Sequence, residues 1–161
     1  MYITKQTDYS LRTLMLLALQ PPQALMSIEE ISKSLAISRA HLMKIVNQLA
    51  QLDLVETVRG RAGGVRLHYD HSEINIGQVF RDLGEITSIV DCDSGPCLFR
   101  GDCKLDYAFQ KASEAFVNEL DQYTLADLVK RRSHLQKIVF HGVNASSVSY
   151  THLTLPTIYS V

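Results

Sequence analysis

The chain has 161 residues and an ordinary hydrophobic content of 46%, which suits one domain or a small domain with an added dimerisation element. Its net charge is −1, but residues 1–67 carry eight Lys/Arg against five Asp/Glu, whereas residues 68–161 carry eight against twelve. The N-terminus is polar, and the apolar run Leu14–Leu19 is too short for a membrane span or a signal core. We therefore expect a cytoplasmic protein without a membrane partner, whose basic front half faces phosphate.

Residues 5–51 predict three helices in succession. The first covers residues 5–20, where apolar side chains recur at helical spacing, and Pro21-Pro22 ends it. Ser27 and Glu30 form a capping box that opens a short second helix through Leu35. Ile37-Ser38 is the turn, and Ser38 can cap a third helix that runs from Arg39 to about Gln51.

The third predicted helix has an inward apolar face made of Leu42, Ile45, Val46 and Leu49. Its outward side chains can donate hydrogen bonds to base edges in the major groove, and its capped N-terminus can meet phosphate. We therefore expect DNA-binding residues on this side, namely Ser38, Arg39, His41, Lys44, Asn47 and Gln48. A solvated helix without a ligand is the alternative.

A β-hairpin is predicted next, because Val55–Arg59 and Val65–His68 alternate as strands around a glycine-rich tip. A flexible cationic tip suits the negative potential of a narrow minor groove. The expected DNA-binding residues of this wing are Arg59, Arg61, Gly63, Gly64 and Arg66. A hairpin that contacts protein is the alternative. Helix, short helix, turn, helix and hairpin is the order of a winged helix-turn-helix domain, which we place at residues 1–84.

The rest of the chain predicts further helices. Asn75 opens one that ends near Gly84, and a cysteine loop occupies residues 85–104. A long helix follows, whose apolar stripe must pack on the domain or on a second subunit: Leu105, Phe109, Ala112, Phe116 and Leu120. Thr124 opens a last helix, Leu125–Arg132. We assign residues 105–141 to a dimerisation helix and a C-terminal helix. The expected fold class is mainly α with a small β-hairpin, a winged helix-turn-helix plus a long dimerisation helix.

Residues 142–161 form a tail, and we leave its last fourteen residues, 148–161, out of the fold and the function. Within it, Val148–Thr157 is the translation of one reading frame of a sequencing-library transposon adapter. We therefore interpret residues 148–161 as an adapter artefact rather than as a genuine β-prone tail.

Three cysteines, Cys92, Cys97 and Cys103, lie within one twelve-residue stretch, and the rest of the chain has none. Glycine, proline and aspartate interrupt this stretch, which predicts a loop. Thiolates gathered in this way hold soft metals or iron–sulfur clusters, and an odd count in a reducing compartment argues against a disulfide framework. The gaps of four and five residues do not match the paired spacing of common zinc sites.

Three thiolates leave a metal or a cluster corner one ligand short, so the fourth ligand is water, a small ligand or a side chain from elsewhere. Such an iron is a point of attack for a small reactive molecule. Three alternatives stay open for the cysteines: a structural zinc with a carboxylate or histidine as fourth ligand, a metal-free redox sensor, and thiols without a joint role.

Enzymatic chemistry has no signature in the chain. The sequence contains no nucleophile–base constellation, no phosphate loop and no paired acidic motif, and none of its six histidines has the spacing of a metal-binding pair. We therefore expect a protein that is not an enzyme and has no histidine ligand.

Five segments together resemble the iron–sulfur winged-helix regulator family, and within it the repressors that sense nitric oxide. They are TDYSLR, SRAHLMKIVNQL, VRGRAGGVRL, the C-x4-C-x5-C loop and ELDQYTLADLV. The similarity covers roughly residues 1–140. A related branch, the regulators of iron–sulfur cluster assembly, carries a histidine three residues after its third cysteine. Here that position is Asp106, and the first gap is one residue shorter, which favours the nitric-oxide branch.

The resemblance implies a homodimer that binds double-stranded operator DNA and carries a cluster, [4Fe-4S] in this branch, on Cys92, Cys97 and Cys103. It also implies that Asp8 of the partner subunit gives the remaining iron an oxygen ligand. Arg12, one helical turn on, can pair with Asp8 and support it, or form an ordinary surface ion pair. Nitric oxide is then the effector: nitrosylation displaces the ligands, changes the spacing of the two recognition helices and releases the operator.

Two other functions remain possible on the same residues. One is a regulator of the same fold that senses iron or cluster status, with a [4Fe-4S] or [2Fe-2S] cluster. The other is a zinc-stabilised module that binds protein through its acidic second half. Iron starvation compared with nitric oxide separates the first from the main hypothesis, and bound zinc would indicate the second.

Overall fold

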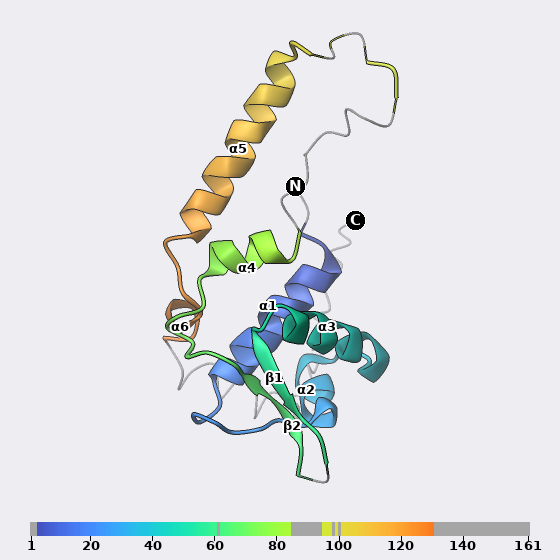
Figure 1. Cartoon of the computed structure of the whole chain (residues 1–161), viewed down its shortest axis with the longest axis vertical. Helices are drawn as coiled ribbons and strands as arrows, with labels where there is room; N and C mark the ends of the chain where they lie inside the picture. The colour runs from blue at the N-terminus through green and yellow to red at the C-terminus, as the bar shows by residue number, and fades with distance from the viewer. Residues whose placement is uncertain (1–2, 61, 85–94, 98, 100, 131–161) are drawn as a thin grey trace, which may run out of the picture.

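The computed structural model describes residues 3–60, 62–84, 95–97, 99 and 101–130. This part contains six helices and one two-stranded sheet, in the order α1–α2–α3–β1–β2–α4–α5–α6 (Figure 1). The predicted class, mainly α with a small β-hairpin, is confirmed. Several predicted features lie outside the described residues: Arg61, Cys92 with most of its loop, and everything from residue 131, including the suspected artefact. The final helix, predicted as Leu125–Arg132, ends earlier, at Leu128, because the backbone of Val129 leaves the helical conformation.

Helix α1 spans Lys5–Ala18, α2 spans Ile28–Leu35 and α3 spans Arg39–Gln51, so the predicted helices form with the expected starts. The capping box at Ser27 is complete, because its hydroxyl accepts from the backbone of Glu30 while the Glu30 carboxylate accepts from the backbone of Ser27. The first helix ends before Leu19, slightly earlier than its apolar pattern suggests. The cap residues therefore define the beginnings of these helices better than the pattern defines their ends.

The hydrophobic core forms around α1, which packs against α2, α3, α6 and β2. Its residues Leu14 and Leu16 are 0% and 2% exposed, and the predicted inward face of α3 is buried in full: Leu42, Ile45, Val46 and Leu49. α1 also buries three polar side chains, of which Ser10 has no hydrogen-bond partner in the described part of the chain. This core holds the helix-turn-helix as one unit.

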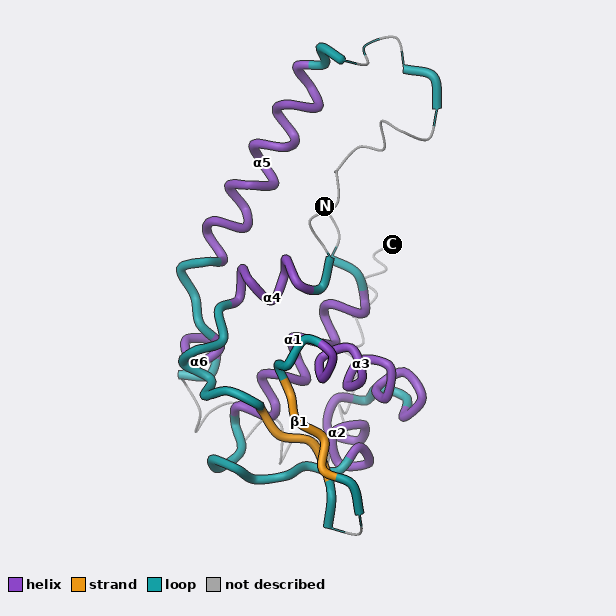
Figure 2. Tube along the Cα trace, viewed as in Figure 1, coloured by secondary structure: helices purple, strands orange, loops and turns teal. Residues whose placement is uncertain are grey.

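Strands β1, Val55–Val58, and β2, Gly64–Leu67, form the antiparallel hairpin (Figure 2). Each observed strand ends one residue before the predicted one, and β2 begins one residue earlier, at Gly64. An isolated bridge between Met26 and Val65 ties the hairpin to the chain just before α2. The wing is therefore fastened to the helix-turn-helix on its β2 side.

Helix α4 spans Ile76–Asp82, α5 spans Lys104–Leu120 and α6 spans Leu125–Leu128. α5 projects from the body of the protein, and Figure 1 shows that only its C-terminal end approaches α4. There Val117 is buried, and the rings of Phe116 and Phe80 meet edge to face at 5.8 Å. At a rise of about 1.5 Å per residue, α5 carries its first residue roughly 18 Å away from this contact.

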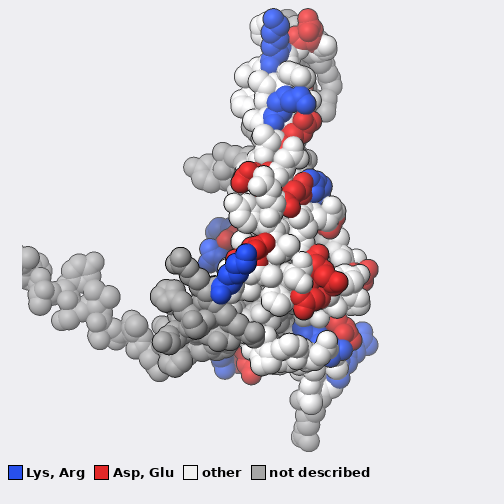
Figure 3. Space-filling view, turned by 90° about the vertical axis from the view of Figure 1, so that its left-hand side faces the viewer, with Lys and Arg blue, Asp and Glu red and all other residues white. Residues whose placement is uncertain are grey.

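The projecting part of α5 exposes apolar side chains. Leu105 is 60% exposed and Tyr107 63%, and Figure 3 shows wide uncharged areas between sparse charges on this part of the surface. The prediction that the stripe packs on the domain is thus met only near Phe116 and Leu120, which contact the core. The remainder is available to a second subunit. Among the described helices, none is long and apolar enough to cross a membrane.

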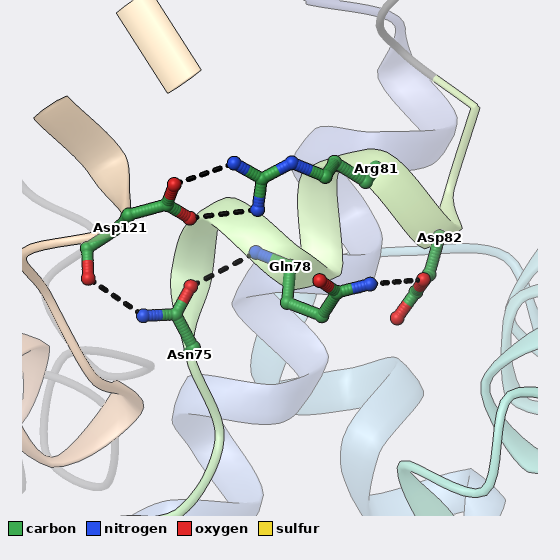
Figure 4. Close-up of polar contacts among 5 residues, drawn as sticks. All are labelled: Asn75, Gln78, Arg81, Asp82 and Asp121. Carbon is green, nitrogen blue, oxygen red and sulfur yellow. Dashed lines mark hydrogen bonds and ion pairs between the residues drawn. The ribbon is translucent and has the colours of Figure 1, made fainter. Parts of the chain in front are cut away.

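The junction between α5 and α6 is joined to α4 by a polar cluster around Asp121 (Figure 4). Both carboxylate oxygens of Asp121 accept from the guanidinium of Arg81, one of them at 2.7 Å, and the backbone oxygen of Asp121 accepts from the side chain of Asn75 at 2.7 Å. Gly77 lies so close that a Cβ there would sit 2.9 Å from the backbone nitrogen of Asp121. Only glycine allows this approach. Figure 4 also shows Asn75 capping α4 at the backbone of Gln78.

We predict that this junction makes stability depend on pH. The hydrogen bonds from Arg81, and then its charge, lower the pKa of Asp121 below its ordinary value of 3.8. The folded protein thus binds this proton more weakly than the unfolded chain does, so the stabilisation is complete above about pH 4 and is lost as the pH falls through the folded pKa. Between about pH 6 and pH 3, the urea midpoint of the wild type should fall further than that of Asp121→Asn. Equal losses would show that the junction does not contribute.

Candidate DNA-binding surface and cysteine loop

The turn between α2 and α3 has a defined geometry that orients the third helix. Ala36 adopts the left-handed conformation, with φ 53° and ψ 39°, and so ends α2. The hydroxyl of Ser32 donates to the backbone oxygen of Ile37 at 2.6 Å, and the hydroxyl of Ser38 then accepts from the backbone of His41 at 3.4 Å. The predicted turn and cap are therefore where the sequence placed them, with Ser38 exposed at the start of α3.

The predicted DNA-contacting side chains of α3 fall into two groups. Arg39, Lys44 and Asn47 are exposed and unobstructed by the core. His41 and Gln48 are half-buried and turn toward α1, where the His41 ring meets Tyr9 edge to face at 5.3 Å and Gln48 accepts a hydrogen bond from Gln6. The first group is free to reach DNA without rearrangement, whereas His41 and Gln48 must give up contacts that orient α3 on α1.

The fold itself requires glycine at two positions of the wing, whether or not these residues contact DNA. A Cβ on Gly64 would lie 2.6 Å from the backbone oxygen of Met26, and one on Gly63 would collide with the backbone oxygen of Val58. These approaches close the tip of the hairpin and allow the bridge to Met26. The sequence analysis predicted that both glycines contact DNA. A glycine-rich basic tip does not indicate whether the backbone close to its glycines belongs to DNA or to the protein itself.

The described wing arginines also differ from each other. Arg59 is exposed at the tip end of β1. Arg66 lies opposite Glu56 in the strand register and forms a cross-strand ion pair with it at 2.8 Å, which leaves the Arg66 side chain 29% exposed. The charge of Arg59 is therefore fully available to a phosphate, and that of Arg66 is partly satisfied within the sheet.

A shallow groove runs between α3 and the wing. Side chains from both elements line it, chiefly Arg39, Met43, Asn47, Val58 and Arg59. Met43 is 48% exposed and was missed by the sequence reasoning, which assigned it neither to the inward face nor to the DNA-binding residues. Its position, one residue off the buried repeat, is the signal that could have identified it.

An acidic residue also lines this groove. Glu29 bonds to Lys33, one turn further along α2, at 2.9 Å. This hydrogen bond, and then the charge of Lys33, lower the pKa of Glu29. The Glu29 carboxylate thus stays ionised, and the charge of Lys33 balances it. The remaining charge of the groove is that of its arginines, which attract a polyanion.

Of the two described cysteines, Cys103 lies at the far end of α5 and Cys97 lies in the loop before it. Cys97 is exposed, Cys103 is half-buried at the N-cap of α5, and both are free thiols. The backbone N–H groups at a helix N-terminus favour a negatively charged neighbour, so this position accepts a metal-bound thiolate. Among the described residues, no three His, Cys, Asp or Glu side chains are arranged to hold a metal ion. The donor types fit an iron–sulfur group, and the third predicted donor, Cys92, lies outside the described residues.

Asp8 lies in the first turn of α1, and its carboxylate accepts from Arg12 at 2.8 Å. The pair forms at the predicted spacing, and the Asp8 side chain is 41% exposed. One carboxylate oxygen is thus held by Arg12 while the group stays accessible to solvent. Only the family resemblance suggests that Asp8 serves as a ligand, because an aspartate in the first turn of a helix is otherwise common.

Helix-turn-helix, basic wing and a projecting helix with thiols at its end define a regulator of the winged-helix class. Residues 3–131 match the Rrf2 family, described as iron-dependent transcriptional regulators, and the chain belongs to this family. It is 42% identical over 142 residues to the HTH-type transcriptional regulator NsrR of Bacillus subtilis, with 86% of this chain and 97% of the relative covered. For the NsrR of Bacillus licheniformis the identity is 40%, with 86% and 99% covered. The resemblance read from the motifs is confirmed as one to NsrR-type regulators.

Solved structures agree on the fold. CymR of B. subtilis, a global cysteine regulator, superposes with a TM-score of 0.64 at 25% identity, with 81% of this chain and 98% of that chain covered. IscR of T. potens superposes with a TM-score of 0.66 at 21% identity, with 84% and 91% covered. The projecting helix and the winged body thus belong to one architecture.

We predict that Gly64→Ala weakens the fold even without DNA, because the new methyl group collides with the backbone of Met26. Overpacking of this kind costs about 1–3 kcal/mol. Urea unfolding of the DNA-free protein measures the loss. Arg59→Ala is the matched control on the same wing and should leave the stability unchanged while it weakens DNA binding. A Gly64→Ala protein of wild-type stability that binds DNA poorly would instead make Gly64 a DNA contact.

Proposed function

We propose that the chain is a homodimeric, DNA-binding transcriptional repressor that carries an iron–sulfur cluster, [4Fe-4S] by resemblance, and senses nitric oxide in the cytoplasm. The observation that carries this proposal is the free thiol of Cys103 at the distal end of α5, with exposed Cys97 in the loop before it, in a chain of the Rrf2 family that is 42% identical to an NsrR. The description of that family as iron-dependent favours iron over zinc among the alternatives.

The cysteine loop supplies the proposed donors. Cys92, Cys97 and Cys103 would hold the cluster through their thiolates, which are the ligands that such clusters prefer. When bound, the cluster supplies iron sites that combine with nitric oxide. Because Cys97 is exposed, a small dissolved molecule can reach this loop without a tunnel. Three thiolates leave one position to another donor.

We infer that the remaining donor is Asp8 of the partner subunit. α5 carries Cys103 roughly 20 Å from its contact with α4 at Phe116, so this thiol extends beyond its own winged body. The exposed apolar stripe of α5 offers the surface on which a second copy can bring its α1 to these thiols. Arg12 orients Asp8 through one carboxylate oxygen and leaves the other free. An oxygen donor dissociates more readily than a thiolate.

The proposed link to DNA is geometric. A dimer must present its two α3 helices about 34 Å apart to enter successive major grooves. Ligation that joins the cysteine loop of one subunit to α1 of the other holds this spacing, because α1 packs directly against α3. Loss of the Asp8 bond frees the two bodies from each other. A coupling of about 3 kcal/mol would then weaken operator binding more than a hundredfold.

The cluster is tested by an anaerobic absorbance spectrum of the wild type and of Cys97→Ala. The wild type should show a broad band near about 400 nm that nitric oxide bleaches, whereas Cys97→Ala should lack the band because one of three thiolates is missing. Arg59→Ala, on the exposed wing and outside the cysteine loop, is the control for general damage and should keep the band. A colourless wild type with stoichiometric zinc would favour the zinc-stabilised module. A coloured protein that releases DNA on iron starvation, but not with nitric oxide, would favour an iron or cluster sensor.

Ligation across the subunits is tested by complementation between two variants. In a mixed dimer of Asp8→Ala and Cys97→Ala chains, the intact cysteines of the first chain face the intact Asp8 of the second, so one site is complete. The mixed dimer should therefore regain, at half the wild-type cluster content, the stability that Asp8→Ala homodimers lose. Ligation within one subunit predicts no complete site in the mixed dimer, and clusters as labile as those of Asp8→Ala would contradict our proposal.

A further inference from the structure

Met43 is an exposed apolar side chain in the middle of the polar face of α3. The other large apolar residues of this helix are buried to 2% exposure or less, namely Leu42, Ile45, Val46 and Leu49, whereas Met43 is 48% exposed. The core of the subunit therefore does not require an apolar side chain at this position. An apolar group that is left in water on a binding surface gains free energy when a partner covers it.

The neighbours of Met43 indicate what covers it. Arg39 and Asn47 stand one turn before it and one turn after it on the same side of α3, about 6 Å away along the helix axis in each direction. Both are exposed donors that line the same groove, and Arg59 closes the groove from the wing. A surface with donors on either side of one apolar group suits a base-pair edge better than a protein core contact, because charged residues are depleted at the centres of protein interfaces.

The major groove of DNA offers one apolar feature, the C5-methyl group of thymine. Arginine and asparagine pair with guanine and adenine edges, so Arg39 and Asn47 have polar targets beside it. An unbranched thioether side chain adapts its shape to a methyl group without a fixed rotamer. We propose that Met43 reads the methyl group of one thymine in each operator half-site, between the bases that Arg39 and Asn47 contact.

This inference rests on the proposed DNA-binding function and deepens it by naming a base that the operator must contain. Covering one methyl group contributes a factor of about four in affinity, so both half-sites together contribute about 15-fold. Discrimination of this size is sufficient to select sites without controlling the overall affinity, which phosphate contacts supply.

The test uses the cluster-loaded full chain and a duplex that the protein itself selects from a randomised pool. Each thymine is replaced in turn by deoxyuridine, which lacks only the methyl group, and the dissociation constant is measured for the wild type, Met43→Ala and Met43→Leu. The wild type should lose about fourfold at one thymine in each half-site. Met43→Ala should bind the unsubstituted duplex more weakly and show no loss at that thymine, while losses elsewhere stay the same. Met43→Leu keeps an apolar side chain of similar volume and should keep the methyl sensitivity.

Three outcomes would overturn the inference, and they differ in what else they affect. Equal deoxyuridine penalties in the wild type and Met43→Ala would show that the methyl effect comes from DNA shape and not from Met43. Absence of any methyl-sensitive thymine would remove the contact altogether. In both cases sequence-selective binding remains and the proposed function stands. Failure of the cluster-loaded wild type to select any duplex would contradict the proposed function itself.

Discussion

Asp121 joins the two halves of this protein, and the position of the thiols depends on it. Its carboxylate holds Arg81 of α4, its backbone oxygen accepts from Asn75, and Gly77 lets the two segments touch. α5 extends from this junction and has no other substantial contact with another described element. The junction at Asp121 therefore fixes the orientation of α5, and with it the direction in which Cys103 lies from the winged body.

The projection of α5 from the winged body is the reason why we propose a second subunit. The apolar side chains of α5 near Leu105 remain in water in the single chain, and burial against a second copy would remove that cost. In the proposed dimer, the same arrangement would bring the cysteine loop of one subunit close to α1 of the other. Because α1 also forms the core on which α3 packs, a ligand on α1 is one helix away from the DNA-binding surface. In the proposed function, sensing and DNA binding would thus share α1 and need no long pathway between them.

Local signals predicted much of the fold, and contacts between distant residues account for what was missed. Ser27, Ser38, Asn75 and Thr124 each cap the helix that the sequence assigned to them, because a cap needs only its own neighbours. The pairing of Arg81 with Asp121 has no local signature, since forty residues separate the partners. In the site, exposed donors on α3 followed from helical spacing. The exposure of Met43 could have followed from the same spacing. The engagement of Arg66 by Glu56 and the turn of His41 and Gln48 toward α1 required the packed structure. Asp8 as a ligand came from resemblance alone.

We propose above all that the cluster on the cysteine loop controls the affinity of the protein for DNA. This proposal is tested most directly by following both in one anaerobic titration with nitric oxide, with fluorescence anisotropy of a protein-selected duplex and absorbance near about 400 nm recorded together. Our account predicts that the duplex is released in parallel with the loss of the absorbance band. A duplex that stays bound after the band has disappeared would contradict it.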